Sequence, residues 1–502
     1  MVDHNGEAYT GNSDAVVMLN FAEDDETYAT SHYTQDVEVK NQFDDADYNF
    51  IAKKNSKSLI TYLDRQDWQG TWPTKVASSN NPASSTDSNM RNYYSTDSSD
   101  KGYKAADKVE YNVQYIDPET DEPSVIRFSE MNKVPLEGEV TNPDSRFYGE
   151  DGAEVWDKFI KQMTLNDLAI SVSDNRGILD VEKVKKKGNS VAEGPEGLLS
   201  RYQYGDKRWA TGFPTGPMYT GTWDHKMQAR FGEFYGEDAL FCGVACVNAP
   251  GCNINRTPYG SRASEYMSED GILNYNTAAN LVGAARRKGL IMNIKHCFLN
   301  NQETNRQGIH TYCNEQAIRE IYLRPFEGAL TKGRGLGIMT SYNRIGARYA
   351  ACHEPLMMNV MRGEWKYRGQ IIDDALTGSN TDQYSNGPAM LHCGTDLFCL
   401  DGGRGGQLSS YISSNDDLTL LKDLQRANKY IMYSISRSMM GGIEFNEFGK
   451  KAWQKAVDGA VIGSVVVTVG LVGLYVFFEV FSKINSAKEK QEAEAEETAE
   501  AE

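Results

Sequence analysis

The sequence predicts an α/β protein whose largest part is a (β/α) TIM-like barrel. Four short runs are apolar throughout rather than alternating, which is typical of strands buried on both faces of a parallel sheet. They lie at residues 243–256, 288–296, 335–343 and 368–374, and stretches with helical Glu, Arg and Lys faces such as 314–332 lie between them. That alternation is the pattern of βα units. Polar residues follow each run, at the strand ends where barrels of this kind place their sites.

The first 145 residues predict part of a smaller α/β domain. Residues 13–20 form an apolar run suited to a buried strand, and residues 57–64 predict the start of a helix. Between about 78 and 101 the composition turns to Ser, Asn and Asp, which is typical of a loop or disordered insertion. Residues 108–128 alternate and break at Asp-Pro-Glu-Thr-Asp, which predicts a hairpin. This region contains too few strands for a complete domain.

The barrel is expected over residues 146–445, opening with a helix from Val155 to Met163, and the segment after it differs sharply. Within a linker and helix at 446–482, the stretch Gly459 to Phe478 contains no charged residue. At about 1.5 Å per residue it is long enough to cross a bilayer, so we expect one transmembrane helix over about 459–481. Residues 483–502 form an acidic tail. Lysines flank the helix on both sides and therefore give no orientation.

Composition narrows the classes of partner. The net charge of −18 argues against nucleic acid, because phosphate binding needs basic patches. The eight cysteines lie between Cys242 and Cys399 with no CxxC pair and no zinc spacing, so we expect no metal or cofactor. Buried thiols are expected, and a disulfide such as Cys242 with Cys246 stays open. The N-terminus has no basic and apolar stretches of a secretory signal.

Two adjacent carboxylates, Asp373 and Asp374, end the run at 368–374. Taken alone, one of them is best explained as the cap of a following helix. The other strand ends change that interpretation, because together they present carboxylates, cations and one phenol. Such a set suits the hydroxyl groups of a sugar, which need charged donors and acceptors at fixed positions. The residues concerned are Glu193, Arg262, Lys295, His296, Tyr342 and Asp374.

Several motifs in order resemble those of glycoside hydrolase family 3, the β-glucosidase-like family. They are EGPEG (193–197), NAPGCNINRTPYGSRASEYMSED (248–270), KHCFLNNQETNR (295–306), MTSYN (339–343) and GEWKYRGQIIDDA (363–375). The resemblance covers roughly residues 155–445, and on these motifs the chain is identified as a member of the family. Glu193 stands where the family usually has Asp, and Ala375 where Trp is common.

The resemblance implies roles for individual residues. Asp374 matches the catalytic nucleophile, and Asp373 becomes a spacer or cap. The positions that match the glycone subsite are Glu193, Arg262, Lys295, His296 and Tyr342. Residues 13–28 are similar to the sandwich-domain stretch that carries the acid/base, which places that role on Glu23. The partial α/β sandwich would then precede the barrel and be incomplete within this sequence. Glu265, Glu303 and Arg306 are expected to be structural ion-pair or loop residues.

The function implied by this resemblance is that of a retaining exo-β-glycosidase, a β-glucosidase that forms a covalent glycosyl-Asp intermediate. Its substrate would be a β-linked glucoside or related oligosaccharide, and its C-terminal helix would hold it in a membrane with the barrel facing outward. The alternative is a degenerate, membrane-tethered glycan-binding protein with little or no turnover. The sequence does not indicate the oligomeric state.

Overall fold

The computed structural model describes residues 108–441 apart from gaps, of which 199–209 and 375–386 are the longest, together with residues 452–499 and a few positions between 42 and 53. The expected strand at 13–20, the helix at 57–64, the insertion at about 78–101 and Glu23 lie outside the described residues. The chain divides into two compact units, Met1–Phe445 and Asn446–Glu502.

A six-stranded sheet forms the centre of the first unit, in the order β11-β8-β6-β5-β4-β3. Its strands are β3 (Gly177–Ile178), β4 (Asn189–Glu193), β5 (Val244–Asn248), β6 (Ile291–Cys297), β8 (Gly337–Thr340) and β11 (Gln370–Ile372). All neighbours pair in parallel except β3, which is antiparallel to β4. All four apolar runs predicted as strands are therefore confirmed as members of one parallel sheet.

Beyond β11 the barrel wall continues through the segment around Leu397. Ile372 pairs with Leu397 in a parallel bridge, and the Phe398 N–H donates to the Val172 carbonyl at 2.8 Å. Val172 directly follows α6 (Leu165–Ser171), the helix after α5 (Gly152–Lys161). The helix predicted from Val155 to Met163 is thus confirmed as α5, and the barrel prediction agrees with the sheet.

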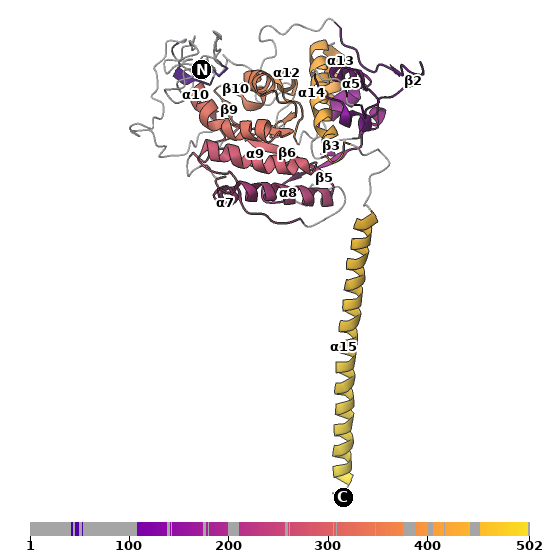
Figure 1. The fold of residues 1–502 in the computed structure, drawn as a ribbon. Helices are drawn as coiled ribbons and strands as arrows, with labels where there is room; N and C mark the ends of the chain where they lie inside the picture. The colour runs from indigo at the N-terminus through magenta and orange to yellow at the C-terminus, as the bar shows by residue number, and fades with distance from the viewer. Residues whose placement is uncertain are drawn as a thin grey trace, which may run out of the picture. The chain divides into compact units, whose positions relative to one another are not determined.

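Helices cover the outside of the sheet, and their ends follow from local sequence (Figure 1). Asp224 and Asp270 accept hydrogen bonds from the first N–H groups of α8 (His225–Cys242) and α9 (Gly271–Arg287), as favoured N-caps do. The two helices pack closely, because a side chain at Gly232 would collide with the Leu281 carbonyl. The predicted helical stretch 314–332 is confirmed by consecutive helical segments from Glu315 to Lys332.

The remaining elements are short or lie at the C-terminal end. A helical stretch contains α10 (Glu315–Ala317), Ile318–Tyr322, α11 (Arg324–Glu327) and Gly328–Lys332, and it is followed along the chain by Pro355–Glu364. The other helices are α7 (Gly216–Thr220), α12 (Gly387–Cys393), α13 (Gly405–Asn415), α14 (Leu418–Ser436) and the short 3₁₀ helices Phe128–Lys133, Glu182–Val184 and Ala350–Cys352. Two small sheets pair β1 (Tyr115–Ile116) with β2 (Pro123–Ser124), and β7 (His310–Thr311) with β9 (Arg344–Ile345) and β10 (Arg348–Tyr349). The antiparallel β1–β2 pair confirms the predicted hairpin.

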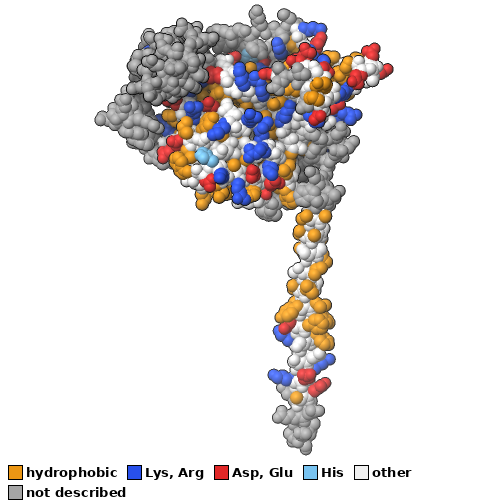
Figure 2. All heavy atoms as spheres, viewed as in Figure 1, with side chains coloured by type: hydrophobic (Ala, Val, Ile, Leu, Met, Phe, Trp, Pro, Cys, Tyr) orange, Lys and Arg blue, Asp and Glu red, His pale blue; other side chains and the backbone are white. Residues whose placement is uncertain are grey.

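The second unit is one helix, α15 (Ala452–Ala499). Its segment Gly459–Ala493 is long and apolar enough to cross a membrane, and none of the side chains in its most apolar part is buried by the rest of the protein. Figure 2 shows hydrophobic side chains along this helix and charged ones toward its C-terminal end. None of the eight cysteines, all of which are described residues, forms a disulfide, so Cys242 and Cys246 are not bonded to each other.

Lys186 is a fully buried lysine between β3 and β4, and it makes the stability of the protein depend on pH. Its Nζ donates to the Lys187 carbonyl at 3.0 Å, and burial lowers its pKa to about 7. An unfolded lysine titrates near pH ~10.4. Between these two values the unfolded chain binds more protons, so the free energy of unfolding should rise with pH by up to about 1.4 kcal/mol per pH unit.

Replacing Lys186 with Met should flatten this dependence between pH 7 and 10, because the variant has no amine to protonate on unfolding. Denaturant unfolding of the full chain at several pH values measures the slope. The matched control is Lys185→Met, which removes an exposed neighbouring amine and should keep the wild-type slope. Equal slopes for wild type and Lys186→Met would show that the buried amine does not control the pH dependence.

Candidate active site

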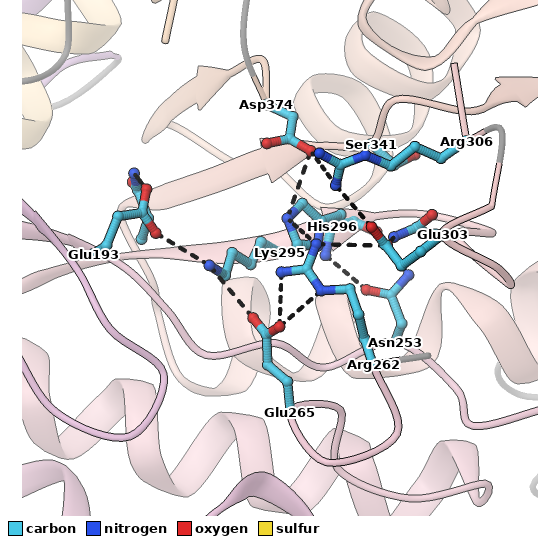
Figure 3. A network of polar contacts seen from close by, with 12 residues as sticks. Glu193, Asn253, Arg262, Glu265, Lys295, His296, Glu303, Arg306, Ser341 and Asp374 are labelled. Atoms are coloured by element: carbon cyan, nitrogen blue, oxygen red, sulfur yellow. Dashed lines mark hydrogen bonds and ion pairs between the residues drawn. The ribbon is translucent and has the colours of Figure 1, made fainter. Parts of the chain in front are cut away.

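The carboxyl ends of the parallel strands bring the predicted site residues to one edge of the sheet. Glu193 ends β4, Lys295 and His296 lie near the end of β6, and Asp374 follows β11 by two residues. Arg262 comes from the segment after β5, and Tyr342 follows β8. Figure 3 shows Glu193, Lys295, His296, Arg262 and Asp374 converging from these separate segments. Glu23 lies outside the described residues.

Asp374 occupies the cationic side of this cluster. Its Oδ2 lies 3.7 Å from His296 Nε2 and 3.7 Å from Arg306 Nη1, and its side chain is 16% exposed. Burial raises the pKa of the Asp374 carboxyl to about 6, while Arg306, Lys295 and Arg262 oppose that rise. At neutral pH the group is therefore mostly a carboxylate, poorly hydrated and held among cations. That is the state a carboxylate nucleophile needs.

Asp373, the neighbouring acid, has a different place. It is fully buried, and its Oδ1 accepts a hydrogen bond from the Cys399 N–H at 2.5 Å. Its own N–H donates to the Leu397 carbonyl at 3.2 Å. Asp373 therefore connects the end of β11 to the next segment of the barrel wall, which fixes the direction in which Asp374 leaves the sheet.

Lys295 lies between two carboxylates. Its Nζ is 3.2 Å from Glu193 Oε2 and 3.4 Å from Glu265 Oε1. Glu265 is also bound to Arg262 at 2.7 Å, so the expectation that Glu265 is an ion-pair residue agrees with the structure. Its partners, however, are two of the site cations. Because buried charges need close partners, these pairs fix the positions of Lys295 and Arg262 before any ligand binds.

His296 is held by its backbone and by its ring. Its N–H donates to Asn253 Oδ1 at 2.6 Å, and its carbonyl accepts from Asn253 Nδ2 at 2.8 Å. Burial and the neighbouring cations Arg262, Lys295 and Arg306 lower the pKa of His296 well below its usual value. The ring is therefore neutral at physiological pH. Lys295, Arg262 and Arg306, rather than His296, supply the positive charge that favours the Asp374 carboxylate.

Arg306 is a site residue that the sequence interpretation missed. Its guanidinium lies 3.7 Å from Asp374 and 4.4 Å from the centre of the Tyr342 ring, and it is bound to Glu303 at 3.0 Å. Arg306 thus has the loop contact that was expected, with Glu303, and also a contact with Asp374 that was not expected. One signal was available in the sequence: Arg306 follows the same strand end as Lys295 and His296, only ten or eleven positions later.

Tyr342 packs beneath Arg306 at the edge of the same site. Burial and the nearby Asp374 carboxylate raise the pKa of Tyr342, so its phenol stays protonated and available as a donor. The Asp374 carboxylate thus faces the guanidinium of Arg306, which favours its charged form.

Below the charged groups, a row of amide side chains crosses the interior of the barrel. Asn248 Nδ2 donates to Glu193 Oε1 at 2.6 Å, Asn293 Nδ2 donates to Asn248 Oδ1 at 2.9 Å, and Gln370 Nε2 donates to Asn293 Oδ1 at 2.8 Å. Gly337 makes room for Asn293, since a side chain there would collide with the amide. This row links four strands and orients Glu193 toward Lys295.

Comparison with known proteins decides the family. Residues 197–414 match the family model described as "Glycosyl hydrolase family 3 N terminal domain". Over these residues the chain has the N-terminal domain of glycosyl hydrolase family 3. The expectation drawn from its motifs is thereby confirmed.

Among the relatives in this family, the thermostable beta-glucosidase B of Acetivibrio thermocellus is 29% identical over 324 residues, which cover 62% of this chain and 41% of that protein. An exo-alpha-(1->6)-L-arabinopyranosidase of Bifidobacterium longum is 32% identical over 248 residues, covering 47% and 32%. The structure of beta-glucosidase 3B from Thermotoga neapolitana in complex with alpha-D-glucose superposes with a TM-score of 0.51 at 26% identity, covering 57% and 43%. This family 3 chain therefore spans less than half the length of each of these relatives.

Proposed function

We propose that the chain is a retaining exo-β-glycosidase, most simply a β-glucosidase, with Asp374 as its nucleophile. The observation that carries the proposal is the Asp374 carboxylate, largely desolvated and 3.7 Å from both His296 and Arg306. The names of the relatives point to hydrolysis of glycosides. They favour an enzyme over the alternative of a glycan-binding protein without turnover.

In this proposal Asp374 attacks the anomeric carbon and forms a glycosyl ester as the leaving oxygen departs. A water molecule then attacks the same carbon and releases the carboxylate, so the configuration is retained. Arg306 and Lys295 balance the charge of Asp374 before attack, while the Lys295, Glu193 and Arg262 groups offer charged partners to sugar hydroxyls.

The proton donor is proposed to be Glu23, on the resemblance of residues 13–28 to the family's acid/base stretch. The nearby carboxylates Glu193, Glu265 and Glu303 are each paired with a cation of the site. In Glu23→Ala, aryl glucosides with poor leaving groups should slow by about 10²-fold or more and those with good leaving groups far less. An equal response across the series would remove Glu23 from this role.

The test of the function is covalent trapping. Full-length protein in detergent is incubated with 2,4-dinitrophenyl 2-deoxy-2-fluoro-β-glucoside, and the labelled peptide is mapped. The good leaving group needs no proton, so the label should form on Asp374 even where acid catalysis is weak. A label on another carboxylate would overturn the assignment. Binding of the sugar without any label would favour the glycan-binding alternative.

The pH dependence of turnover should follow the raised pKa of Asp374, about 6. As pH falls through this value the nucleophile is protonated and cannot attack, so kcat/KM should decline on the acid side. In Arg306→Gln the loss of a neighbouring cation should move this decline upward by roughly one pH unit. The control Arg287→Gln removes an exposed guanidinium of α9 and should leave it in place. A decline unchanged by Arg306→Gln would contradict the proposed role of Arg306.

We also propose that α15 anchors the protein in a membrane through about 459–481, with the barrel outside. Its apolar, unburied surface over Gly459–Ala493 supports this placement. Resistance to alkaline carbonate extraction and digestion of the barrel by protease added to intact cells would support it. Release of the protein by carbonate would contradict the membrane anchor. Full protection of the barrel from the protease would contradict the proposed orientation.

A further inference from the structure

A chain of four side chains leads from the loop after β6 to the ring of His296. Glu303 Oε1 accepts from Asn300 Nδ2 at 2.9 Å, and the same Nδ2 donates to the Tyr266 hydroxyl at 2.7 Å. The Tyr266 hydroxyl in turn lies 3.0 Å from His296 Nδ1. We propose that this chain makes Asn300 and Tyr266 positioning residues, which keep the proton of neutral His296 on Nε2, facing Asp374.

The orientation of the Asn300 amide is the first step. Glu303 is ion-paired with Arg306 and Arg262, and as a carboxylate it can only accept hydrogen bonds. The Asn300 group facing it must therefore be the NH2, since the amide oxygen there would face a negative charge. The NH2 has two hydrogens, so the second is available to the Tyr266 hydroxyl.

The Tyr266 proton is the second step. Tyr266 is 3% exposed, and burial raises the pKa of its phenol, so it carries its proton. Its oxygen already accepts from Asn300, and His296 Nδ1 is the neighbouring acceptor at hydrogen-bond distance. The phenol thus donates to Nδ1. A neutral imidazole that accepts at Nδ1 carries its single proton on Nε2.

The opposite tautomer, with the proton on Nδ1, is favoured by Arg262 and disfavoured by Tyr266 and Asp374. Arg262 Nη1 lies 3.4 Å from Nε2 and would donate to an unprotonated Nε2. That guanidinium is already bound to Glu265 at 2.7 Å. With the proton on Nδ1, the buried Tyr266 hydrogen would lose its acceptor, and the lone pair of Nε2 would face the Asp374 carboxylate at 3.7 Å. An unpaired buried polar group is destabilising, so the Nε2–H form is favoured.

This arrangement gives the site a neutral donor on the side of the His296 ring that faces Asp374. An imidazole N–H can orient Asp374 or hold a sugar oxygen beside it without adding charge, and its tautomer must be fixed for either task. This consequence rests on the proposed function, whereas the tautomer itself does not.

The direct test is nuclear magnetic resonance of the full chain labelled with 15N-histidine in detergent micelles. Signals of His296 are identified by their loss in His296→Gln. The expected wild-type pattern has a protonated Nε2, coupled to both ring C–H protons, and an unprotonated Nδ1. In Tyr266→Phe, which removes only the hydroxyl, the proton should redistribute toward Nδ1. Asn300→Asp replaces the NH2 with an acceptor, so the phenol should turn to the new carboxylate and the same redistribution should follow.

A proton on Nδ1 in the wild type, protons on both nitrogens, or a His296 spectrum unchanged in both variants would overturn the proposal. Thermal unfolding curves of each variant exclude a merely unfolded site. Because the spectrum needs no turnover, a fixed Nε2–H tautomer in an inactive protein would contradict the proposed function alone.

If the protein is a glycosidase, kcat/KM of Tyr266→Phe should fall by about tenfold, the factor given by roughly 1.4 kcal/mol. Tyr275→Phe, the same change on α9, should keep wild-type kinetics and the wild-type His296 spectrum. A redistributed proton with unchanged kcat/KM would show that the tautomer is fixed for folding and not for the reaction.

Discussion

Replacing Asp374 with glycine is expected to lower kcat/KM for β-glucosides by about 10⁴-fold or more, because loss of a nucleophile removes the covalent route altogether. Glu193, Glu265 and Glu303 come from segments of the chain other than the end of β11, so none of them is expected to occupy the position of Asp374. Steady-state hydrolysis of an aryl β-glucoside, with the full chain in detergent, measures the loss.

Two further measurements tie that loss to nucleophilic attack. Azide added to Asp374→Gly should enter the vacated space on the face of the sugar opposite the leaving group and yield the α-glucosyl azide. Asp373→Asn is the matched control at the adjacent acid. It keeps an oxygen for the Cys399 N–H, so its kcat/KM should stay within about tenfold of wild type, the value of one ordinary hydrogen bond. A large loss in Asp373→Asn together with an active Asp374→Gly would exchange the two assignments.

The parallel sheet could be predicted from the sequence because its strands are buried on both faces. Such strands need continuous apolar runs, and the runs that became β5, β6, β8 and β11 were visible for that reason. β4 was not predicted, since Asn189–Glu193 contains only two apolar residues and obtains its place from pairing with β5 and from Tyr and Asn side chains around its end.

The residues of the candidate site that lie at the ends of predicted strands could be predicted from the sequence. Lys295, His296 and Asp374 stand there, and the parallel register brings them together. The contact of Arg306 with Asp374 was not predicted, because it depends on the path of a loop. A periodic pattern of apolar residues does not indicate that path. Tyr266 and the row of Asn248, Asn293 and Gln370 were missed for a related reason. The role of a single polar residue within an apolar run can be inferred only when its hydrogen-bond partner on another strand is known.

The largest expected effect on stability belongs to Arg362, which forms a buried ion pair beside β11, the strand that ends next to Asp374. Its Nη2 lies 2.5 Å from Asp396 Oδ2, and its Nη1 donates to the Gly369 carbonyl at 2.6 Å. Asp396 Oδ2 also accepts from the Ile371 N–H at 2.8 Å, so the pair holds the start and the middle of β11. Burial raises the pKa of Asp396 to about 6, and Arg362 opposes that rise.

Arg362→Met should therefore lower the free energy of unfolding by about 3–5 kcal/mol, because it leaves a buried carboxylate without its partner. Arg368→Met is the control at a less buried arginine. It removes the pair with Glu137 and the hydrogen bonds to the Arg362 and Tyr367 carbonyls, and it should cost about 1–2 kcal/mol. The double variant Arg362→Met/Asp396→Asn removes the stranded charge and keeps an acceptor for Ile371, so it should recover part of the loss. Denaturant unfolding of the four proteins measures these differences. Equal losses for Arg362→Met and Arg368→Met would show that the buried pair does not stabilise β11, and the position of Asp374 would then depend on the Asp373–Cys399 contact instead.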